Sequence, residues 1–253
     1  MKRNKKAQIW GSEPEFFGPL HYFRESLIIA YLDASIREGE ILDVGLGSGS
    51  LSFRLVARGF KVKGIDLSAG FVKYVNQKIK EMGIERQLAV RKDDATRLNF
   101  ENNSFDGIVC GEVLEHIEND FLAIREMNRV LKKGGICVMT VPANPGLWDF
   151  SDEWAGHYRR YQKSELKALL ENNGFKVDRI EFWGFPLVRI YHRFIFLPLL
   201  KRKLNKTREK HGEFYKKTIF KKFSPWASHI FRIDNLFNRF PWGIGLIARA
   251  IKI

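Results

Sequence analysis

A glycine-rich turn between a predicted strand and a predicted helix constrains this chain more than any other feature. The stretch Ile41–Leu51 reads ILDVGLGSGSL, an apolar strand that ends near Asp43, three alternating glycines and the start of a helix. Such glycines let the backbone approach a ligand closely and make a turn that a Cβ would forbid. The next predicted strand ends at Asp66, where a carboxylate can accept hydrogen bonds from both hydroxyls of a ribose. The two features together predict a nucleotide-type site.

The same turn departs from the pattern of NAD-binding proteins. That pattern reads GxGxxG, whereas here the third glycine is Gly49 and Ser50 stands where the last glycine is expected. A dehydrogenase also has no need of an acid at Asp43. A ligand that carries an amino group does, because the carboxylate can pair with it. The turn therefore favours a nucleoside ligand with an amino group.

Short apolar runs alternate with longer amphipathic runs from residue 40 to 182, and this alternation predicts βαβ units with a mainly parallel sheet. A final strand is expected to return beside residues 175–182 after a long insertion. The predicted strands are 40–45, 61–66, 87–91, 105–110, 135–141, 175–182 and 243–253, and the predicted helices are 49–58, 68–82, 119–131 and 162–173.

Composition excludes several classes of protein. Apolar residues make up 45% and charged residues 28% of 253 positions, which is typical of a globular chain and not of a disordered or coiled-coil one. Two cysteines, Cys110 and Cys137, are too few for a disulfide scaffold or a cysteine-rich zinc module. No stretch reaches the ~18–20 apolar residues of a membrane span. We therefore expect a cytoplasmic protein, either free or peripheral at the inner face of the membrane.

The positive charge is unevenly placed along the chain. Residues 184–253 hold 16 Lys and Arg against three acidic residues, whereas residues 1–183 hold 27 against 26. A nearly neutral body therefore carries a basic region near the C-terminus. This asymmetry indicates an anionic partner, such as an acidic lipid, a nucleic acid or an anionic substrate.

Ordered motifs over residues 40–182 resemble those of class I S-adenosylmethionine (SAM)-dependent methyltransferases of the small-molecule type. The motifs are LDVGLGSGS at 42–50, GIDLS at 64–68, DATRLNF at 94–100, NSFDGIVCGEVLEHI at 103–117, REMNRVLKKGG at 125–135 and VPA at 141–143. The resemblance implies an α/β fold with a Rossmann-like, seven-stranded, mostly parallel sheet, helices on both faces and an antiparallel last strand. The expected organisation is a helical lid at 1–39, a SAM-binding core at 40–183, a basic aromatic insertion at 184–242 and a final core strand at 243–253.

The resemblance also implies where SAM would bind. The expected contacts are Asp43, Gly45, Gly47 and Gly49 with the methionine part, Asp66 with the ribose, Leu67 with the adenine ring, Asp94 and Ala95 with the adenine amino group, and Glu112 near the sulfonium. Alternative interpretations stay open at this point. The glycines could form a simple packing turn, and the carboxylates could cap helices or face solvent.

Some methyl acceptors are disfavoured. DNA amino-methyltransferases carry an Asn/Asp-Pro-Pro-aromatic motif after the fourth strand, where this chain reads Cys110-Gly111-Glu112-Val113. Cytosine-C5 enzymes use a Pro-Cys or Thr-Cys dipeptide, and neither dipeptide occurs.

The segment after the fifth strand is the candidate acceptor site, because it overhangs the carboxyl edge of the sheet. Its G-H-x-R-R-Y sequence at 156–161 resembles a bacterial and archaeal subgroup often associated with cell-envelope glycan or lipid-linked sugar pathways. His157 is the first candidate for a general base and His116 the second, since a histidine titrates near neutral pH. The predicted acceptor contacts are Trp148, Tyr158, Arg159, Arg160 and Tyr161.

Two interpretations of the arginines compete. Guanidinium groups match phosphate or carboxylate groups of an acceptor. Alternatively, Arg159, Arg160 and Tyr161 brace their loop against Asp149, Asp152 or Glu153. No metal site is predicted.

The basic insertion interleaves apolar and aromatic residues with Lys and Arg. This pattern suits a helix lying on an anionic membrane surface, a solvated cover over the active site, or, less well, a nucleic-acid interface. The sequence thus predicts a SAM-dependent methyltransferase that methylates oxygen on a lipid-linked, glycan or quinone-like acceptor. The alternatives are an RNA methyltransferase and a non-catalytic SAM-binding protein at the membrane surface.

Overall fold

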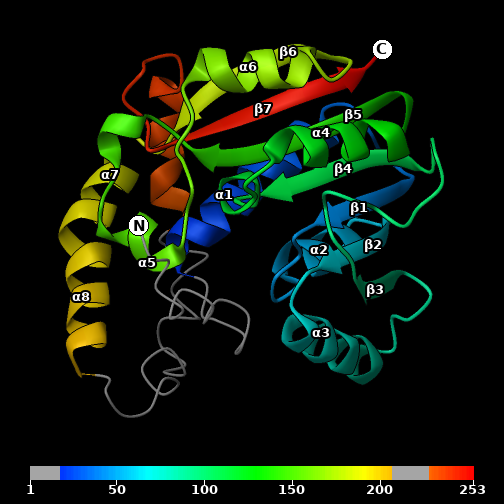
Figure 1. The fold of residues 1–253 in the computed structure, drawn as a ribbon. Coiled ribbons are helices and arrows are strands. Elements are labelled where there is room, and N and C mark those ends of the chain that lie inside the picture. The colour runs from blue at the N-terminus through cyan, green and yellow to red at the C-terminus, as the bar shows by residue number, and fades with distance from the viewer. Residues whose placement is uncertain (1–17, 207–227) are drawn as a thin grey trace.

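A seven-stranded sheet forms the centre of the computed structural model, which describes residues 18–206 and 228–253 (Figure 1). The strand order is β3-β2-β1-β4-β5-β7-β6. All neighbouring pairs are parallel except those of β7, which runs antiparallel to both β5 and β6. The expected Rossmann-like sheet with an antiparallel last strand is therefore confirmed. The strands are β1 (Glu40–Val44), β2 (Lys61–Asp66), β3 (Leu88–Lys92), β4 (Phe105–Gly111), β5 (Leu131–Pro142), β6 (Phe175–Trp183) and β7 (Gly245–Lys252).

Helices cover both faces of the sheet, because adjacent strand residues point to opposite sides and both sides are apolar. Leu42 packs with helices α4 and α6, whereas its neighbour Ile41 packs with α1, α2 and α3 on the other side. The helices are α1 (Pro19–Asp33), α2 (Ser50–Val56), α3 (Ala69–Met82), α4 (Asp120–Val130), α5 (Phe150–Ala155), α6 (Lys163–Glu171), α7 (Leu187–Tyr191) and α8 (Leu197–Lys206). Short 3₁₀ segments lie at η2 (Leu114–His116), η3 (Pro145–Leu147) and η5 (Phe231–Phe237), and a π-helical turn, η4 (His192–Phe196), joins α7 to α8.

Local signals in the sequence explain where several elements begin and end. The Ser68 hydroxyl accepts a hydrogen bond from the Phe71 N–H and caps α3, and Gly83 ends that helix in the left-handed conformation. The predicted helix over 119–131 ends one residue earlier, and β5 begins at Leu131 instead of Gly135. Leu131 is already paired with Phe105, and a register shift then carries the chain to the pair Gly107 and Ile136.

The insertion between β6 and β7 packs on the core through a buried carboxylate. Asp234 of η5 accepts hydrogen bonds from the backbone N–H groups of Leu187 and Val188, at the start of α7. Its neighbour Phe231 packs against Tyr191 and Phe23, so η5, α7 and α1 meet in one cluster. The predicted lid over 1–39 is described only from residue 18, where α1 follows, and residues 207–227 of the insertion lie outside the described part. Within the described residues no helix is both long enough and apolar enough to cross a membrane.

Candidate active site

A large cavity of about 2120 Å³ lies at the carboxyl ends of β1, β2 and β4. Residues of α1, α5, η4 and α8 also line it. In an open parallel sheet this edge, where the strand order reverses beside β1, is where ligands bind. The residues predicted to bind SAM and the acceptor are therefore expected to line this cavity.

Gly45 and Gly47 of the glycine turn line the cavity, whereas Gly49 precedes α2 and does not line it. Gly45, Gly47 and Gly49 all have positive φ angles, of 71°, 55° and 79°. A Cβ on Gly45 would overlap the side chain of Val113, whereas a Cβ on Gly47 would meet nothing within 4 Å. Gly45 is thus required by protein packing, but Gly47 leaves open space that faces the cavity. That open space is a cradle that a ligand can fill.

Asp43 is buried at the end of β1 and lines the cavity. Its carboxylate accepts a hydrogen bond of 2.6 Å from the Ser52 hydroxyl. Burial raises the pKa of Asp43 to about 7, and the charges of Glu25 and Asp66 act in the same direction. A cationic ligand would offset this cost, because it would pair with the ionised carboxylate.

Asp66 is held in place by two backbone N–H groups at the end of β2. Its two carboxylate oxygens accept hydrogen bonds of 2.9 Å from Gly47 and 2.8 Å from Ser68. Burial raises the pKa of Asp66, and these two hydrogen bonds partly oppose the rise. The next residue, Leu67, also lines the cavity with a side chain that is 66% exposed. An apolar side chain beside a fixed carboxylate suits a nucleoside, with the base over Leu67 and the ribose at Asp66.

The loop after β3 supplies Asp94 and Ala95 to the cavity. One oxygen of Asp94 accepts hydrogen bonds from the N–H and the hydroxyl of Thr96, both at 2.8 Å. The neighbouring Asp93 is tied to Arg91 and to the Asn99 N–H. These contacts fix the loop and set Asp94 beside the predicted adenine end of the site.

Glu112 follows β4 with a φ angle of 57°, a conformation that is rare for a residue with a side chain and costs roughly 1–3 kcal/mol. Its Oε1 is buried without a hydrogen-bond partner, and its Oε2 lies 3.8 Å from a guanidinium nitrogen of Arg24. The Nε of Arg24 is likewise buried and unpartnered. Glu112, whose backbone is strained, and Arg24, whose guanidinium is incompletely paired, therefore line the same cavity.

These features fit SAM. The ligand has an ammonium and a carboxylate at its methionine end, and the cavity offers Asp43, Glu112 and Arg24 there. It has a ribose and an adenine at its other end, where Asp66, Leu67 and Asp94 lie. The Gly47 cradle lies between the two ends. Of these groups, the buried Oε1 of Glu112 and Nε of Arg24 have no hydrogen-bond partner in the protein, and a ligand of this kind would supply one.

The predicted base His157 is anchored to a buried carboxylate. Its Nδ1 lies 2.9 Å from Asp152 Oδ1, and Arg160 Nε lies 2.9 and 3.0 Å from the two oxygens of Asp152. Burial on its own would raise the pKa of Asp152, but the hydrogen bonds from His157, Arg160 and the Asp149 N–H outweigh it and lower the pKa to about 2. An ionised carboxylate only accepts hydrogen bonds, so Nδ1 of His157 carries a proton, and in the neutral ring Nε2 is the nitrogen that can accept one.

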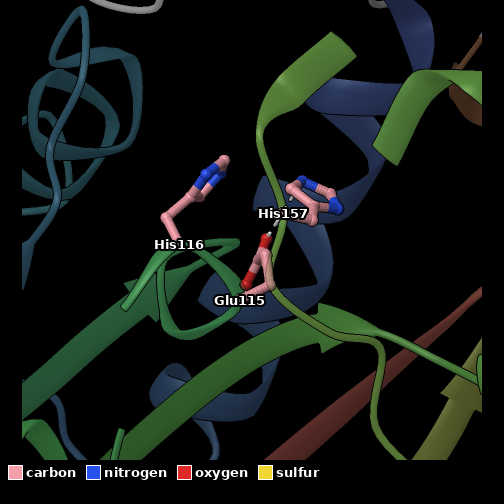
Figure 2. A group of neighbouring side chains, drawn as sticks. All are labelled: Glu115, His116 and His157. Atoms are coloured by element: carbon pink, nitrogen blue, oxygen red, sulfur yellow. Dashed lines mark ion pairs between the residues drawn. The ribbon is translucent and has the colours of Figure 1, made fainter. Parts of the chain in front are cut away.

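His116 and Glu115 lie beside His157, and Figure 2 shows the three side chains together. The His116 and His157 rings meet edge to face at 4.7 Å, and Glu115 Oε1 lies 4.0 Å from His157 Nε2. Burial, followed by the charge of His157, lowers the pKa of His116 to about 4. Burial also raises the pKa of Glu115 well above its usual range, next to the charge of Glu112. One ligating atom from each of the three lies within 4.8 Å of the others, so this cluster has metal-like spacing, and the predicted absence of a metal stays a prediction.

The predicted acceptor contacts divide between two places. Trp148, Tyr158 and Arg160 line the main cavity. Arg159 and Tyr161 instead bind the Asp120 carboxylate at 2.9 and 2.8 Å. These two residues border only a second cavity of about 530 Å³, which the other three border as well. These contacts agree with the bracing interpretation. Asp120 is the partner of Arg159 and Tyr161, and Asp152 is the partner of Arg160. A role for Arg159 and Tyr161 in acceptor binding stays a prediction.

Several site residues were missed by the sequence analysis. Arg24, His21 and Glu25 reach the cavity from α1, and Glu25 is buried against Arg54 at 2.8 Å. The signal was weak, because α1 precedes the recognisable motifs and its polar residues have no fixed spacing to them. The sequence indicates Asp152 only as a brace for its loop, whereas in the structure it also orients His157.

Comparison with known proteins agrees with this geometry. A family model described as a methyltransferase domain matches residues 42–139. Ubiquinone biosynthesis O-methyltransferase of Nitrosospira multiformis is 28% identical over 75% of this chain and 85% of its own length. Phosphatidylethanolamine N-methyltransferase of Cereibacter sphaeroides is 35% identical over 54% of this chain and 66% of its own length.

A solved structure shares the fold. Phosphoethanolamine N-methyltransferase 2 of Haemonchus contortus, solved in complex with SAM, aligns with a TM-score of 0.66 at 17% identity, over 97% of this chain and 56% of the other. The domain match, the named relatives and a cavity that fits SAM identify this chain as a class I SAM-dependent methyltransferase.

Proposed function

We propose that this methyltransferase transfers the methyl group of SAM to an oxygen atom of a quinone-like, lipid-linked or glycan acceptor, with His157 as the general base. The observation that carries the proposal is the pairing of His157 with the buried, ionised Asp152 at the edge of the cavity. The general small-molecule character of the reaction also agrees with the acceptors named for the relatives of this chain.

The pairing of His157 with Asp152 favours oxygen as the methylated atom. SAM, when bound, supplies a methyl group that its sulfonium already activates. The chain then has two tasks, which are to position the acceptor and to remove its proton. A hydroxyl is a poor nucleophile until it loses that proton, whereas a neutral amine attacks without such help. Asp152 keeps the proton of His157 on Nδ1, so Nε2 is ready to accept one.

The walls of the cavity favour a large, partly apolar acceptor. Trp148 and Trp154 line it beside α5, and Tyr191, Phe196 and Leu200 line it from the insertion. Arg160 also lines the cavity, and it binds the same Asp152 carboxylate as the proposed base His157. The named relatives include an enzyme of ubiquinone biosynthesis and one that methylates a phospholipid, which supports a quinone-like or lipid-like acceptor for this chain.

Transfer of an isotope-labelled methyl group tests the proposal. The full-length protein would be incubated with SAM carrying a carbon-13 methyl group and with a total lipid extract or total RNA of its source cells. The neutral quinone, phospholipid, lipid-linked sugar and RNA fractions would then be separated. We expect label in the quinone or lipid-linked sugar fraction, with the carbon-13 shift of a methyl group bonded to oxygen.

The variant His157→Gln is the matched control, because it removes the base and keeps a side chain of similar polarity. It should bind SAM and transfer little label. Label on a phospholipid nitrogen that persists in His157→Gln would contradict O-methylation, and label confined to RNA would overturn the acceptor class.

A further inference from the structure

The helical segment 187–202, made of α7, η4 and the first part of α8, has two unlike faces. Its inner face lines the active-site cavity with His192, Phe196 and Leu200. The same segment contacts α5, where Ser151 lies 3.5 Å from His192 and the Lys201 ammonium lies over the Phe150 ring. The inner face is thus part of the site.

The outer face of this segment exposes large apolar side chains. Ile190, Phe194 and Pro198 recur every four residues, and Ile195 lies beside Phe194. Phe194 is 71% exposed, and Ile190 and Ile195 are also exposed. Side chains at this spacing share one face of a helix. Because these side chains are exposed, burying them requires a surface outside the described residues.

The charge on this segment is entirely positive. Residues 187–202 contain four Lys and Arg and no Asp or Glu. Arg193, Lys201 and Arg202 are exposed next to the apolar residues. An apolar stripe flanked by cations is the pattern of a helix that lies in the interface of an anionic membrane. Most of the exposed apolar side chains here are aliphatic and offer no ring for a base to stack on, so the pattern favours lipid over RNA.

A second exposed apolar group is joined to this segment. Leu236 of η5 is 78% exposed, and η5 is fixed to α7 through Asp234. Phe240 and Trp242 stack on each other at 4.9 Å and are both about half exposed, and Arg189 of α7 donates a hydrogen bond to the Trp242 carbonyl. Aromatic rings that are half exposed suit the headgroup level of a bilayer.

We infer that the segment 187–202 docks on an anionic lipid bilayer through Ile190, Phe194 and Ile195, so that its inner face leads a lipid-borne acceptor from the bilayer into the active site. The docking itself needs no methyl transfer, whereas the route of the acceptor rests on the proposed function. Docking would place the cavity wall formed by His192 and Phe196 directly above the lipid headgroups.

Vesicle binding tests docking without SAM or acceptor. The full-length protein would be titrated with vesicles of phosphatidylcholine and phosphatidylglycerol at 3:1, and with vesicles of phosphatidylcholine alone, and the bound fraction would be measured by sedimentation. We expect binding to the anionic vesicles and at least tenfold weaker binding to the neutral ones. The variant Phe194→Glu should weaken anionic binding at least tenfold, and so should the double variant Lys201→Glu, Arg202→Glu.

Two matched variants control for charge and polarity. Phe121→Glu makes the same change at an exposed phenylalanine of α4, and Lys73→Glu with Lys80→Glu makes the same charge change on α3. Both should bind vesicles as the unaltered protein does. SAM binding and circular dichroism would show that all variants are folded.

Three results would overturn the inference. The first is equal binding of the protein to neutral and anionic vesicles. The second is a loss of vesicle binding in the control variants that equals the loss in Phe194→Glu. The third is displacement of the protein from vesicles by an RNA oligonucleotide, together with normal vesicle binding by Phe194→Glu. Loss of vesicle binding in Phe194→Glu with methyl transfer to detergent-dispersed acceptor intact would support docking. No transfer at all, with vesicle binding intact, would count against the proposed function alone.

Discussion

The charge on Asp43 lowers the stability of the fold, but it is expected to favour the binding of SAM. Burial raises its pKa to about 7, so it loses its charge in the folded, SAM-free protein as the pH falls through neutrality. A carboxyl group with a raised pKa stabilises the folded state less as the pH rises, because the charged form is the costly one. An ionised Asp43 is nevertheless the form that can pair with the ammonium group of SAM.

We therefore expect the affinity for SAM to fall as the pH falls below 7. A proton and the ammonium group compete for the same carboxylate, so the Kd should rise about tenfold for each pH unit below the pKa. Isothermal titration calorimetry at pH 8, 7 and 6 would measure this slope. In Asp43→Asn the affinity should be low and almost independent of pH, and a slope that survives in this variant would assign the dependence to another group.

The two histidines of the site make a second prediction at the residue scale. His116 has a pKa lowered to about 4 by burial and by His157, so it is a weak base at neutral pH. His157 is oriented by Asp152 and lies on the cavity. His157→Gln should lower kcat roughly 10²–10⁴-fold, the usual contribution of a general base, and leave the Kd for SAM unchanged.

His116→Gln is the comparison variant, and steady-state kinetics with a methylated product as the readout would separate the two. We expect a loss below tenfold for His116→Gln. A larger loss in His116→Gln than in His157→Gln would exchange their roles.

Single residues of the site were predictable to the extent that their neighbours in the chain determine them. Asp43 and Asp66 end adjacent parallel strands, so the strand pattern alone brings them to one edge. Asp120 as the partner of Arg159 and Tyr161 was not predictable, because the two segments are about 40 positions apart and meet only through packing. The same holds for Arg24, which α1 carries across the sheet.

At the scale of elements, two glycines of the turn between β1 and α2 have different tasks. Gly45 is needed for packing, and Gly47 faces the proposed ligand site. Gly45→Ala places a Cβ against Val113 and should lower the stability of the fold. Gly47→Ala has open space around the new Cβ, so it should cost only the roughly 1–2 kcal/mol of a left-handed alanine. We expect Gly47→Ala to lose SAM binding at least tenfold with a small change in Tm, as measured by calorimetry.

Gly83→Ala is the matched control for this prediction. Gly83 has a φ of 64° and open space around a new Cβ, like Gly47, but it caps α3 and does not line the cavity. It should show the same small change in Tm with normal SAM binding. If both variants bind SAM normally, the Gly47 cradle is not part of the cofactor site.

Element boundaries were predictable where a cap marked them. Ser68 and Gly83 delimit α3 as expected from their side-chain chemistry. The junction of α4 and β5 was placed wrongly, because Lys132 and Lys133 look like the end of a helix. In the structure Leu131 already pairs with Phe105 of β4, and the Lys132 ammonium binds the Asp106 carboxylate of the same strand. The boundary between α4 and β5 depends on a contact between strands, which the local sequence pattern does not show.

At the scale of the whole molecule, the mainly parallel sheet was predictable from the alternation of elements, and its seven strands with an antiparallel last strand from the resemblance to a known family. The position of β7 between β5 and β6 shows how the insertion fits, since both of its ends return to the same part of the sheet. The function of the insertion was not predictable to the same degree. Its charge is visible in the sequence, but which side chains face the cavity and which face solvent depends on the packing of α7 and η4.

The insertion and the core should unfold together and respond together to SAM. Val188 and Phe231 of the insertion belong to the same buried cluster as Phe23 of α1 and Leu55 of α2, so the described parts share one core. A ligand that binds only the folded state adds ~2.7 kcal/mol at a concentration of 100 times its Kd. For a chain of this size that corresponds to a rise in Tm of about 5–11 °C.

Differential scanning calorimetry would show one transition that shifts as a whole when SAM is added. The same concentration of uridine, which lacks the methionine part and the adenine, should leave the transition in place. Two transitions, of which SAM moves only one, would mean that the insertion folds as a separate unit. In that case the wall of the cavity formed by η4 and α8 could open without disturbing the cofactor site, because the contacts of Asp234 and Phe231 would be too weak to couple them.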